Sequence, residues 1–430
     1  MKKLLLILFL AVICSNAGSG IEGKKLRLSG NSKEEQLKKE VAENLTSNIL
    51  SYWTSKMVDN KNGGFFGRID YKDQVFPEAD KGGILNARIL WTYSSAYRVL
   101  HDTLYLRLAT RAKNYILKHF IDPQYGGAYR SLNFRGEPSD DKKQVYTEAF
   151  FIYALSEYSR ATGDRLAVQE ARKIFDLVEK YARDMEFNGY YEVFSRDWKR
   201  VRERLIGESS NEVEKTMNTH LHVMEAYANL YRVTGDKLVG ERLRNLINIF
   251  LDDIIDKKSS HLICFFDRNW KSTASIDSYG HDIESSWLLL EAATILKDPN
   301  LIARVNKICI KIANAAAEGI QPDGSLLTEK DNATGSIRPT RSWWEQAETV
   351  VGNLNAFGLT GDEKYLDRSI NCWNYIKKYF VDIKNGGWYS YVSEKGTPGQ
   401  GDKAGFWICP YHNGRMCMEV IERVSGTENK

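Results

Sequence analysis

The chain has 430 residues, of which 43% are hydrophobic and 12% aromatic, which is enough to bury a large core. Its 60 basic and 56 acidic residues leave a net charge of +4, and no dense basic run follows the N-terminal segment. This composition argues against a surface for nucleic acid or anionic lipid. The 10 Trp and 23 Tyr suit sugar binding, although core packing is the simpler explanation for any single one of them.

The first 17 residues have the features of an export signal. Two lysines precede an apolar run over residues 4–13, and Ala17 closes the segment with a small side chain. The run is too short to span a bilayer as a helix, and no later segment is a candidate to do so. Cys14 also resembles a lipoprotein site, which leaves cleavage after Ala17 and lipidation at Cys14 as alternatives. We expect an exported protein, located in the periplasm or attached to the outer membrane.

A short motif recurs along the rest of the chain. Each copy has turn-forming residues, usually glycine, followed by alternating aromatic or apolar residues, which predicts a short hairpin. The copy near residue 261 is degenerate. The six copies begin near residues 62, 125, 188, 261, 323 and 385.

Two helices are predicted between successive hairpins, separated by a second recurring motif. Its clearest copies are Thr162-Gly163-Asp164, Thr234-Gly235-Asp236 and Thr360-Gly361-Asp362, with His101-Asp102 and Lys297-Asp298-Pro299 in equivalent places. Glycine suits the end of one helix, and the aspartate can cap the next. The helix before each motif is strongly apolar. The helix after it is amphipathic, as in Leu166, Val168, Ala171, Ile174, Phe175 and Val178.

Six pairs of apolar inner and amphipathic outer helices predict an all-α protein, an (α/α)6 toroid forming one domain over residues 31–425. An open solenoid is the alternative. We expect the helix Asn31–Met57 to be the outer partner of the first inner helix.

Polar residues gather where the inner helices begin, and in a toroid these positions converge on one basin. Asn218 and His222 are four residues apart, and His281 and Glu284 are three apart, so each pair shares a helix face. A carboxylate beside a histidine fixes its tautomer and raises its basicity. The candidates at these positions are Arg88, Tyr146, Asn218, His220, His222, His281, Glu284, Trp343, Trp344, Trp407 and His412.

Several of these side chains also have structural explanations. His220 could point into the wall, and because Trp343 and Trp344 are neighbours on a helix, we expect only one of them to face the basin. Glu225 and Glu348 are either supports for the site or ordinary ion-pair partners. Arg88 is costly to bury without a ligand or polar partner, which favours substrate binding. The structural histidines are expected to be His101, His119 and His261.

The sequence does not predict a metal site or a disulfide framework. Five cysteines lie beyond the N-terminal segment, an odd number without close pairing, and they are expected to be small buried apolar residues. No CxxC or HExxH motif occurs. The five are Cys264, Cys309, Cys372, Cys409 and Cys417.

The motifs at the starts of four inner helices resemble those of the cellobiose 2-epimerases in the N-acylglucosamine 2-epimerase superfamily. The similarity runs from about residue 35 to 425, and its specificity comes from the combination of motifs. They are Asn218-Thr219-His220-Leu221-His222, Gly280-His281-Asp282-Ile283-Glu284, Arg341-Ser342-Trp343-Trp344-Glu345-Gln346, and Trp407 with Cys409-Pro410-Tyr411-His412-Asn413-Gly414-Arg415.

The resemblance implies an (α/α)6 barrel that inverts C2 of the reducing-end sugar in β-1,4-linked disaccharides such as cellobiose and mannobiose, without cofactor or metal. It implies His281 and His412 as the two acid/base residues and His222 as the residue that assists ring opening. The substrate-binding residues that it implies are Arg88, Tyr146, Asn218, Glu284, Trp343, Trp344 and Trp407.

Several alternatives remain open at this point. An aldose–ketose isomerase, or an epimerase of monosaccharides or N-acylglucosamine, could use the same ring. A glycoside hydrolase or lyase would rely on carboxylate or Tyr–His pairs, which the two histidines fit less well. An exported glycan-binding protein without activity is the non-enzymatic alternative. The expected partner is a disaccharide or short oligosaccharide, and the protein is expected to be a monomer or weak dimer.

Overall fold

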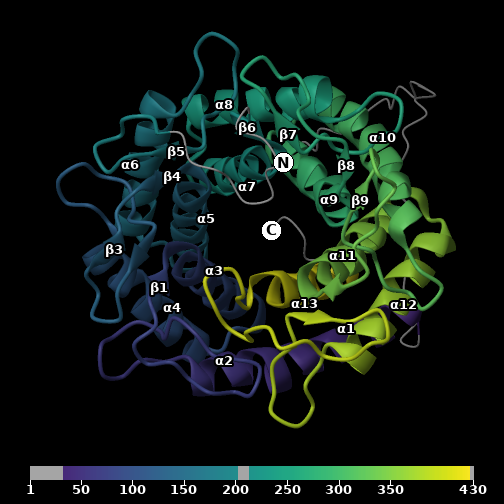
Figure 1. Ribbon diagram of the computed structural model, residues 1–430, viewed down its shortest axis with the longest axis horizontal. Helices are drawn as coiled ribbons and strands as arrows, with labels where there is room; N and C mark the ends of the chain where they lie inside the picture. The colour runs from purple at the N-terminus through teal and green to yellow at the C-terminus, as the bar shows by residue number, and fades with distance from the viewer. Residues whose placement is uncertain (1–31, 202–212, 427–430) are drawn as a thin grey trace, which may run out of the picture.

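The structure is a computed structural model that describes residues 32–201 and 213–426. The predicted export signal and Cys14 lie outside the described residues. The helices form two concentric layers around a central axis, an (α/α)6 barrel (Figure 1). The inner layer consists of α3 (Gly83–Leu100), α5 (Val145–Thr162), α7 (Met217–Thr234), α9 (Tyr279–Ile295), α11 (Trp343–Thr360) and α13 (Tyr411–Ser425).

The outer layer follows the same order around the ring. It consists of α1 (Lys33–Asn44) with α2 (Ser51–Lys56), α4 (Thr103–Tyr115), α6 (Arg165–Tyr181), α8 (Lys237–Ile249), α10 (Pro299–Ala316) and α12 (Glu363–Tyr379). Short π-helical turns over Leu45–Leu50, Ile116–Phe120 and Phe250–Ile254 and a 3-10 turn over Ala317–Gly319 continue α1, α4, α8 and α10.

The ring is closed by contact between its first and last inner helices, which rules out the open solenoid. The last inner helix, α13, packs against the first, α3. Our expectation for the helix at residues 31–57 was wrong: α1 packs mainly against α13. Each of the first five inner helices packs on the outer helix that follows it in sequence, so α13, which none follows, takes the N-terminal helix.

The predicted helix ends are confirmed. Gly163, Gly235 and Gly361 end α5, α7 and α11 in the left-handed conformation, which glycine adopts without strain. The side chain of the next aspartate then accepts a hydrogen bond from the first turn of the following outer helix. His101 ends α3 in the same conformation, and is thus structural, as expected.

The two helix layers bury their residues as the patterns predicted, with one exception. In α5 every residue from Val145 to Tyr158 is buried, whereas α6 buries only one face. Leu166 is 67% exposed, because Ala167 takes the buried position in its place. The five described cysteines are buried and free. Within residues 32–201 and 213–426, no helix has both the length and the apolar character that crossing a membrane requires.

All six predicted hairpins form, including the degenerate copy. Each closes with one antiparallel bridge, at Val58–Phe65, Ile121–Ala128, Arg183–Tyr190, Ile255–Leu262, Ile320–Leu326 and Val381–Trp388. Short strands also join neighbouring repeats just before the inner helices. The antiparallel pairs are β1 (Lys81–Gly82) with β2 (Ser131–Leu132), β2 with β3 (Pro138–Asp140), β4 (Lys143–Gln144) with β5 (Val193–Phe194), β6 (Lys215–Thr216) with β7 (Phe265–Phe266), β8 (Ile276–Asp277) with β9 (Lys330–Asp331), and β10 (Arg341–Ser342) with β11 (Tyr391–Val392).

A polar residue at the fourth position of four inner helices ties each helix to the hairpin before it. Its side chain accepts a hydrogen bond from a backbone N–H that the hairpin leaves unpaired. The pairs are Glu148 with Ala128, His220 with Tyr190, Asp282 with Leu262, and Gln346 with Leu326. His220 therefore belongs to the wall, since its Nδ1 also lies 2.7 Å from the carbonyl oxygen of Thr216.

Buried lysines provide a second tie at the same end of the barrel. In each case the ammonium group is fully buried and bonds an aspartate at the start of a hairpin, the arrangement that a buried charge requires. The pairs are Lys81–Asp59 at 2.9 Å, Lys143–Asp122 at 3.2 Å, Lys215–Asp184 at 3.1 Å and Lys403–Asp382 at 2.5 Å. Together, the two ties fix the inner-helix N-termini from which the candidate residues project.

Candidate active site

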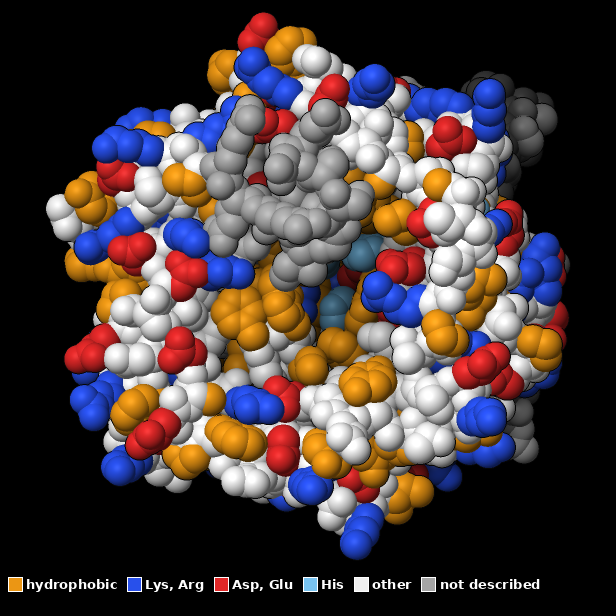
Figure 2. Space-filling view, in the orientation of Figure 1, with side chains coloured by type: hydrophobic (Ala, Val, Ile, Leu, Met, Phe, Trp, Pro, Cys, Tyr) orange, Lys and Arg blue, Asp and Glu red, His pale blue; other side chains and the backbone are white. Residues whose placement is uncertain are grey.

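The centre of the ring is hollowed on the face shown in Figure 2, where histidine atoms are visible inside the opening and hydrophobic side chains lie along its rim. The candidate residues reach this region from the first two turns of the six inner helices and from the loop before α13. The toroid thus brings together positions separated by more than 300 residues in the chain, from Arg88 to His412.

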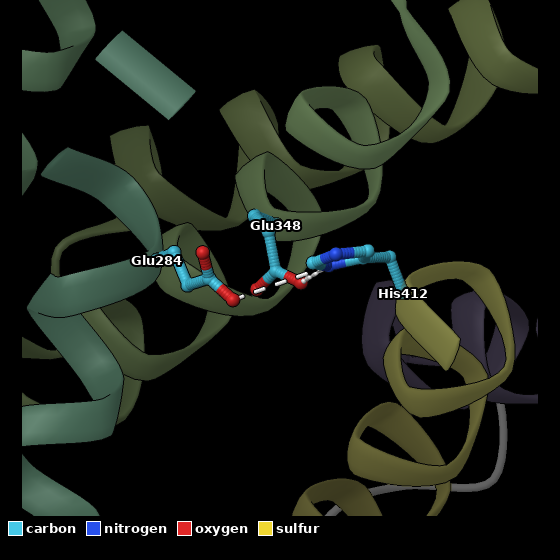
Figure 3. A group of neighbouring side chains, drawn as sticks. All are labelled: Glu284, Glu348 and His412. Carbon is cyan, nitrogen blue, oxygen red and sulfur yellow. Dashed lines mark hydrogen bonds and ion pairs between the residues drawn. The ribbon is translucent and has the colours of Figure 1, made fainter. Parts of the chain in front are cut away.

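His412 begins the last inner helix and is held from behind by a carboxylate. Its Nδ1 lies 2.7 Å from Oε1 of Glu348 (Figure 3). The second oxygen of Glu348 accepts a hydrogen bond of 3.0 Å from the indole N–H of Trp287. Because Nδ1 donates to Glu348, the Nε2 atom of His412 is free to exchange a proton with a substrate.

His281 is the third residue of α9 and has a different partner. Its Nδ1 lies 2.7 Å from the hydroxyl oxygen of Ser278, a neutral group. The rings of His281 and His412 both contact Trp344, with centroid distances of 4.8 and 5.5 Å. Two imidazoles from different walls of the barrel therefore share one aromatic neighbour.

Both tryptophans at the start of α11 contact the site, contrary to our expectation that only one would. The ring of Trp343 lies 6.3 Å from that of His412, edge to face, and Trp343 and Trp344 are both half-buried. As the first two residues of the helix, they extend from its open end, so neither is forced into the wall.

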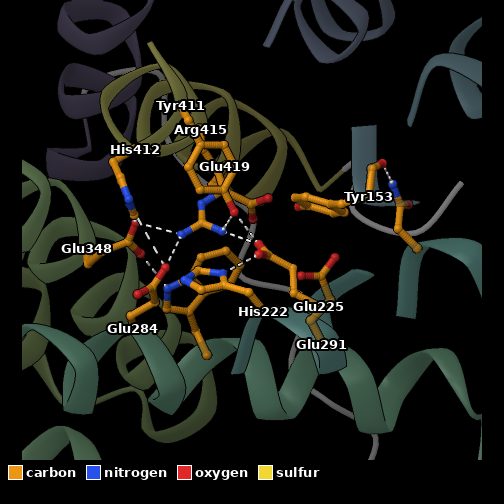
Figure 4. Close-up of polar contacts among 12 residues, drawn as sticks. Tyr153, His222, Glu225, Glu284, Glu291, Glu348, Tyr411, His412, Arg415 and Glu419 are labelled. Carbon is orange, nitrogen blue, oxygen red and sulfur yellow. Dashed lines mark hydrogen bonds and ion pairs between the residues drawn. The ribbon is translucent and has the colours of Figure 1, made fainter. Parts of the chain in front are cut away.

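A cluster of charged side chains lies beneath the histidines, centred on Arg415 (Figure 4). One guanidinium nitrogen of Arg415 is 2.6 Å from Glu284 and 2.7 Å from Glu348, and the other bonds Glu225. The cluster holds three carboxylates and one guanidinium, all buried. Burial and the Glu348 charge raise the pKa of Glu284, whereas Arg415 and His412 hold the pKa of Glu348 low despite its burial.

The oxygen and nitrogen atoms of Glu284, Glu348 and His412 lie within 4.8 Å of one another, a spacing that a metal ion could use. Here Arg415 already supplies the positive charge, since the same nitrogen bonds both carboxylates. A cation between these oxygens would face a guanidinium, and we therefore do not assign a metal to this group.

His222 lies on the opposite side of the cluster and is supported in the same way as His412. Its Nδ1 is 2.9 Å from Oε2 of Glu225, whose other oxygen bonds Arg415 and the hydroxyl of Tyr411. The ring of Tyr146 stands edge-on to His222 at 4.9 Å. Glu225 and Glu348, which sequence patterns left undecided, thus support one histidine each.

Arg88 is buried with little to neutralise its charge. Its guanidinium bonds the Tyr146 hydroxyl at 2.9 Å and lies over the rings of Phe150 and Tyr411. Among the described residues, no carboxylate lies within ion-pair distance of Arg88, and its Nε has no hydrogen-bond partner. A buried cation in this state favours an anionic or polar ligand.

The remaining candidates line the same region less closely. Trp407, in the loop before α13, lies edge-on to Tyr146 at 5.7 Å. Asn218 is half-buried on the first turn of α7, four residues before His222, and its side-chain oxygen has no hydrogen-bond partner among the described residues. Both are therefore placed to contact a ligand rather than to hold the wall.

The catalytic candidates are neutral in the resting structure. Burial lowers the pKa of His281 to about 3. It also lowers the pKa of His412 to about 3, although the nearby Glu348 carboxylate acts in the opposite direction. Burial likewise lowers the pKa of His222. A neutral imidazole can accept a proton, and the carboxylates behind His412 and His222 stabilise the cation that results.

Sequence reasoning gave no role to two residues that organise the site, Trp287 and Arg415, although Arg415 lies in one of the four motifs. Their contribution depends on contacts across the ring, to carboxylates 61 to 190 positions away. Three glutamates on the faces of inner helices, at positions 225, 284 and 348, were a usable signal, because buried carboxylates require a cation.

Comparison with known proteins agrees with this geometry. The family model for N-acylglucosamine 2-epimerase (GlcNAc 2-epimerase) matches residues 64–413. A cellobiose 2-epimerase from Bacteroides fragilis is 49% identical over 389 residues, covering 90% of this chain and 99% of that protein. One from Ruminococcus albus is 41% identical over 89% of this chain and 98% of its own length. The structure of a cellobiose 2-epimerase from Bacillus thermoamylovorans superposes with a TM-score of 0.87 at 41% identity, covering 90% and 99% of the two chains.

Family membership follows from the extent of these matches. The family model covers residues 64–413, from the first hairpin to the start of α13, and so includes the histidine openings. The fold is that of the family, and the two supported histidines and the buried arginine occupy its centre. The chain belongs to the N-acylglucosamine 2-epimerase family, groups with its cellobiose 2-epimerases, and is an isomerase that epimerises carbohydrates.

Proposed function

We propose that this enzyme inverts C2 of the reducing-end sugar in β-1,4-linked disaccharides, converting cellobiose to glucosyl-mannose and mannobiose to mannosyl-glucose, without a cofactor. The observation that carries the proposal is the pair His281 and His412, which approach one indole from two walls of the ring. Relatives named as cellobiose 2-epimerases, 49% and 41% identical, support the substrate class.

The first step is opening of the sugar ring. The proton of the O1 hydroxyl must leave as the ring oxygen gains one, which yields the open-chain aldehyde. His222 is neutral and supported by Glu225, so it can take up and return this proton. The aldehyde then acidifies the C2 proton.

The second step inverts C2 through an enediolate. One imidazole removes the C2 proton, and the electron pair moves onto O1. Rotation about the C2–C3 bond presents the other face of C2, and the opposite imidazolium returns a proton there while the O1 charge is released. Arg88 can stabilise the charge on O1, because its guanidinium is buried and lacks a carboxylate partner.

His281 and His412 differ in the group that bonds Nδ1, and therefore in how readily each ring holds a second proton. Glu348 behind His412 stabilises an imidazolium, whereas Ser278 behind His281 is neutral. Because both imidazoles are neutral at rest, the reacting form of the enzyme must first take up one proton from solvent. Glu348 favours His412 as the site of this proton, so His412 is the proton donor and neutral His281 is the base in this direction. In the reverse direction the roles exchange, as microscopic reversibility requires.

The test is incubation of the purified protein with cellobiose and with mannobiose in D2O, followed by NMR analysis of the products. The proposal requires the C2 epimer with deuterium at C2. The single variants His281→Ala and His412→Ala should each lose both signals, and His119→Ala, which lacks any contact with the site, should keep them.

Other products would decide between the alternatives. A ketose as the main product would mean that the proton returns to C1 of the same enediolate, and the protein would be an aldose–ketose isomerase. Activity confined to monosaccharides or N-acylglucosamine would overturn the proposed substrate. No exchange with any of these sugars, together with measurable sugar binding, would point to an inactive glycan-binding protein.

The proposed reaction takes place outside the cytoplasm, a proposal that rests on the N-terminal segment alone. Mass spectrometry of the protein from its native host distinguishes a chain that starts after Ala17 from one lipidated at Cys14. An unmodified N-terminus in the cytoplasmic fraction would contradict both. We propose a monomer or weak dimer, which light scattering would test.

A further inference from the structure

The fourth repeat differs from its neighbours in how the N-terminus of its inner helix is held. In α3, α5 and α7 a buried lysine stands two residues before the helix and pairs with a hairpin aspartate. Before α9 that position is Asp277, and the cation comes instead from the hairpin, as His261. In the fourth repeat the acidic residue therefore precedes the helix and the basic residue lies in the hairpin, and an imidazole replaces the lysine ammonium group.

His261 is surrounded by carboxylates on three elements, which we call the His261 cluster: His261, Asp277, Asp282 and Glu318. Its Nδ1 lies 2.6 Å from Asp282 Oδ2 on α9. Its Nε2 lies 4.0 Å from Asp277 on β8 and 3.6 Å from the exposed Glu318 after α10. The ring of Tyr279 stands edge-on at 5.9 Å, and His261 is only 4% exposed.

The His261 cluster is attached directly to a catalytic candidate. Asp282 follows His281 in the sequence, and its second oxygen accepts a hydrogen bond of 2.8 Å from the backbone of Leu262. His281 in turn bonds Ser278, one residue before α9 begins. The position of the His281 ring is therefore determined by the first turn of α9, which Asp282 anchors to the hairpin.

We propose that His261 is a positioning residue for His281, and that loss of its proton at alkaline pH loosens the first turn of α9. Only the activity measurements below rest on the proposed function. His261 does not touch the site itself, because Asp282 and its own hairpin separate it from the basin.

The physical reason is the balance of charge around the ring. Protonated His261 offers an N–H to Asp282 and another toward Asp277 and Glu318. After deprotonation, Nε2 presents a lone pair to those two carboxylates, and the fully buried Asp282 loses its counter-charge. Burial alone would lower the pKa of His261, but Asp282, Asp277 and Glu318 raise it to about 9.

The sign of the effect follows from this shift. The folded-state pKa lies above the value near 6.5 of an unfolded histidine, so the contribution of His261 is complete below about pH 6.5 and is lost as the pH rises through about 9.

The first experiment follows the histidine rings by NMR in protein labelled at histidine Cε1. Seven histidines make assignment by single substitutions feasible. We expect the His261 signal to titrate near pH 9 and the His281 signal to move with the same midpoint, although His281 itself stays neutral. A His261 midpoint below pH 7, or a His281 signal that does not respond, would overturn the proposal.

The second experiment measures epimerisation of cellobiose as a function of pH. His261→Gln should lower kcat about ten-fold with little change in KM, because a displaced base costs rate rather than binding. Its kcat should also lack the decline near pH 9 that we expect of the native enzyme. His119→Gln is the matched control and should keep the native profile.

A milder variant keeps the proposal testable if His261→Gln does not fold. Asp277→Asn leaves the bond between His261 and Asp282 intact but removes one carboxylate, so the His261 midpoint and the alkaline decline of kcat should shift to lower pH together. A shift of the His261 midpoint without a shift of the kcat decline, or the reverse, would contradict the proposed control of His281 by His261. If the native protein lacks epimerase activity, the proposed function fails, while the NMR titration still decides whether His261 controls His281.

Discussion

The Nδ1 atom of His412 lies 2.7 Å from Oε1 of Glu348, and the same oxygen bonds Arg415 at 2.7 Å. One carboxylate thus connects an imidazole that faces the sugar basin with the buried charge cluster beneath it. Because Trp287 bonds the other oxygen, Glu348 has little freedom to turn away. The consequences for activity and stability can be measured separately.

Glu348→Gln should lower kcat about 100-fold while leaving the fold intact. The amide has the shape of the carboxylate, but it no longer stabilises the His412 imidazolium, and it can present an N–H to Nδ1 and so favour the wrong tautomer. Deuterium exchange at C2 measures the effect. Glu291→Gln, on the far end of α9, is the control and should exchange at the native rate. Native exchange in Glu348→Gln would contradict the role of this carboxylate.

Arg88→Lys should reduce kcat more than it raises KM, by about ten- to 100-fold. The charge is kept, but an ammonium cannot reproduce the planar guanidinium that bonds Tyr146 and, in the proposed mechanism, also stabilises the charge on O1. Steady-state kinetics on cellobiose provides the test, with Arg107→Lys on the outer helix α4 as control. An increase in KM alone would mean that Arg88 binds the ground state and not the developing charge.

Arg415→Met should destabilise the protein by about 3–5 kcal/mol, because it leaves three buried carboxylates without a cation. The loss of unfolding free energy should be smaller at low pH, since protonation of Glu225, Glu284 or Glu348 then removes the unpaired charge. Denaturant unfolding at pH 5 and pH 8 measures both values. Equal losses at the two pH values would show that packing, not charge, explains the effect.

His220→Ala should cost about 1–3 kcal/mol without changing the epimerisation chemistry, because the Tyr190 backbone N–H loses its acceptor. His220→Gln should recover most of that stability, since Gln346 fills the same role in the fifth repeat. Thermal unfolding measures both variants. A loss of kcat in the stable glutamine variant would place His220 in the site after all.

Acid should destabilise the native protein below about pH 6.5. Burial lowers the pKa of His220 to about 4 and that of His281 to about 3. Below about pH 6.5 the unfolded chain therefore binds protons at these histidines, whereas the folded protein does not. The stability is present above pH 6.5 and is lost as the pH falls toward these values. His220→Gln should show a shallower decline in unfolding free energy between pH 6.5 and 4, and an unchanged slope would exclude this contribution.

The amino-acid sequence by itself determined the ring and the location of its centre. Six hairpins at nearly constant spacing, glycine helix ends followed by aspartate caps, and apolar helices alternating with amphipathic ones are local patterns, each with a local physical cause. From them the (α/α)6 barrel follows, and so does the gathering of histidines at the inner-helix openings.

Only the tertiary structure decided which of these residues act together. The partner of α1 is α13, the support of His412 is Glu348, and the cation among the glutamates is Arg415, each a contact between distant parts of the chain. Local periodicity contains no information on such pairs. They depend on how the ring closes, because a buried charge is stabilised by whichever partner the closed ring brings within hydrogen-bond distance.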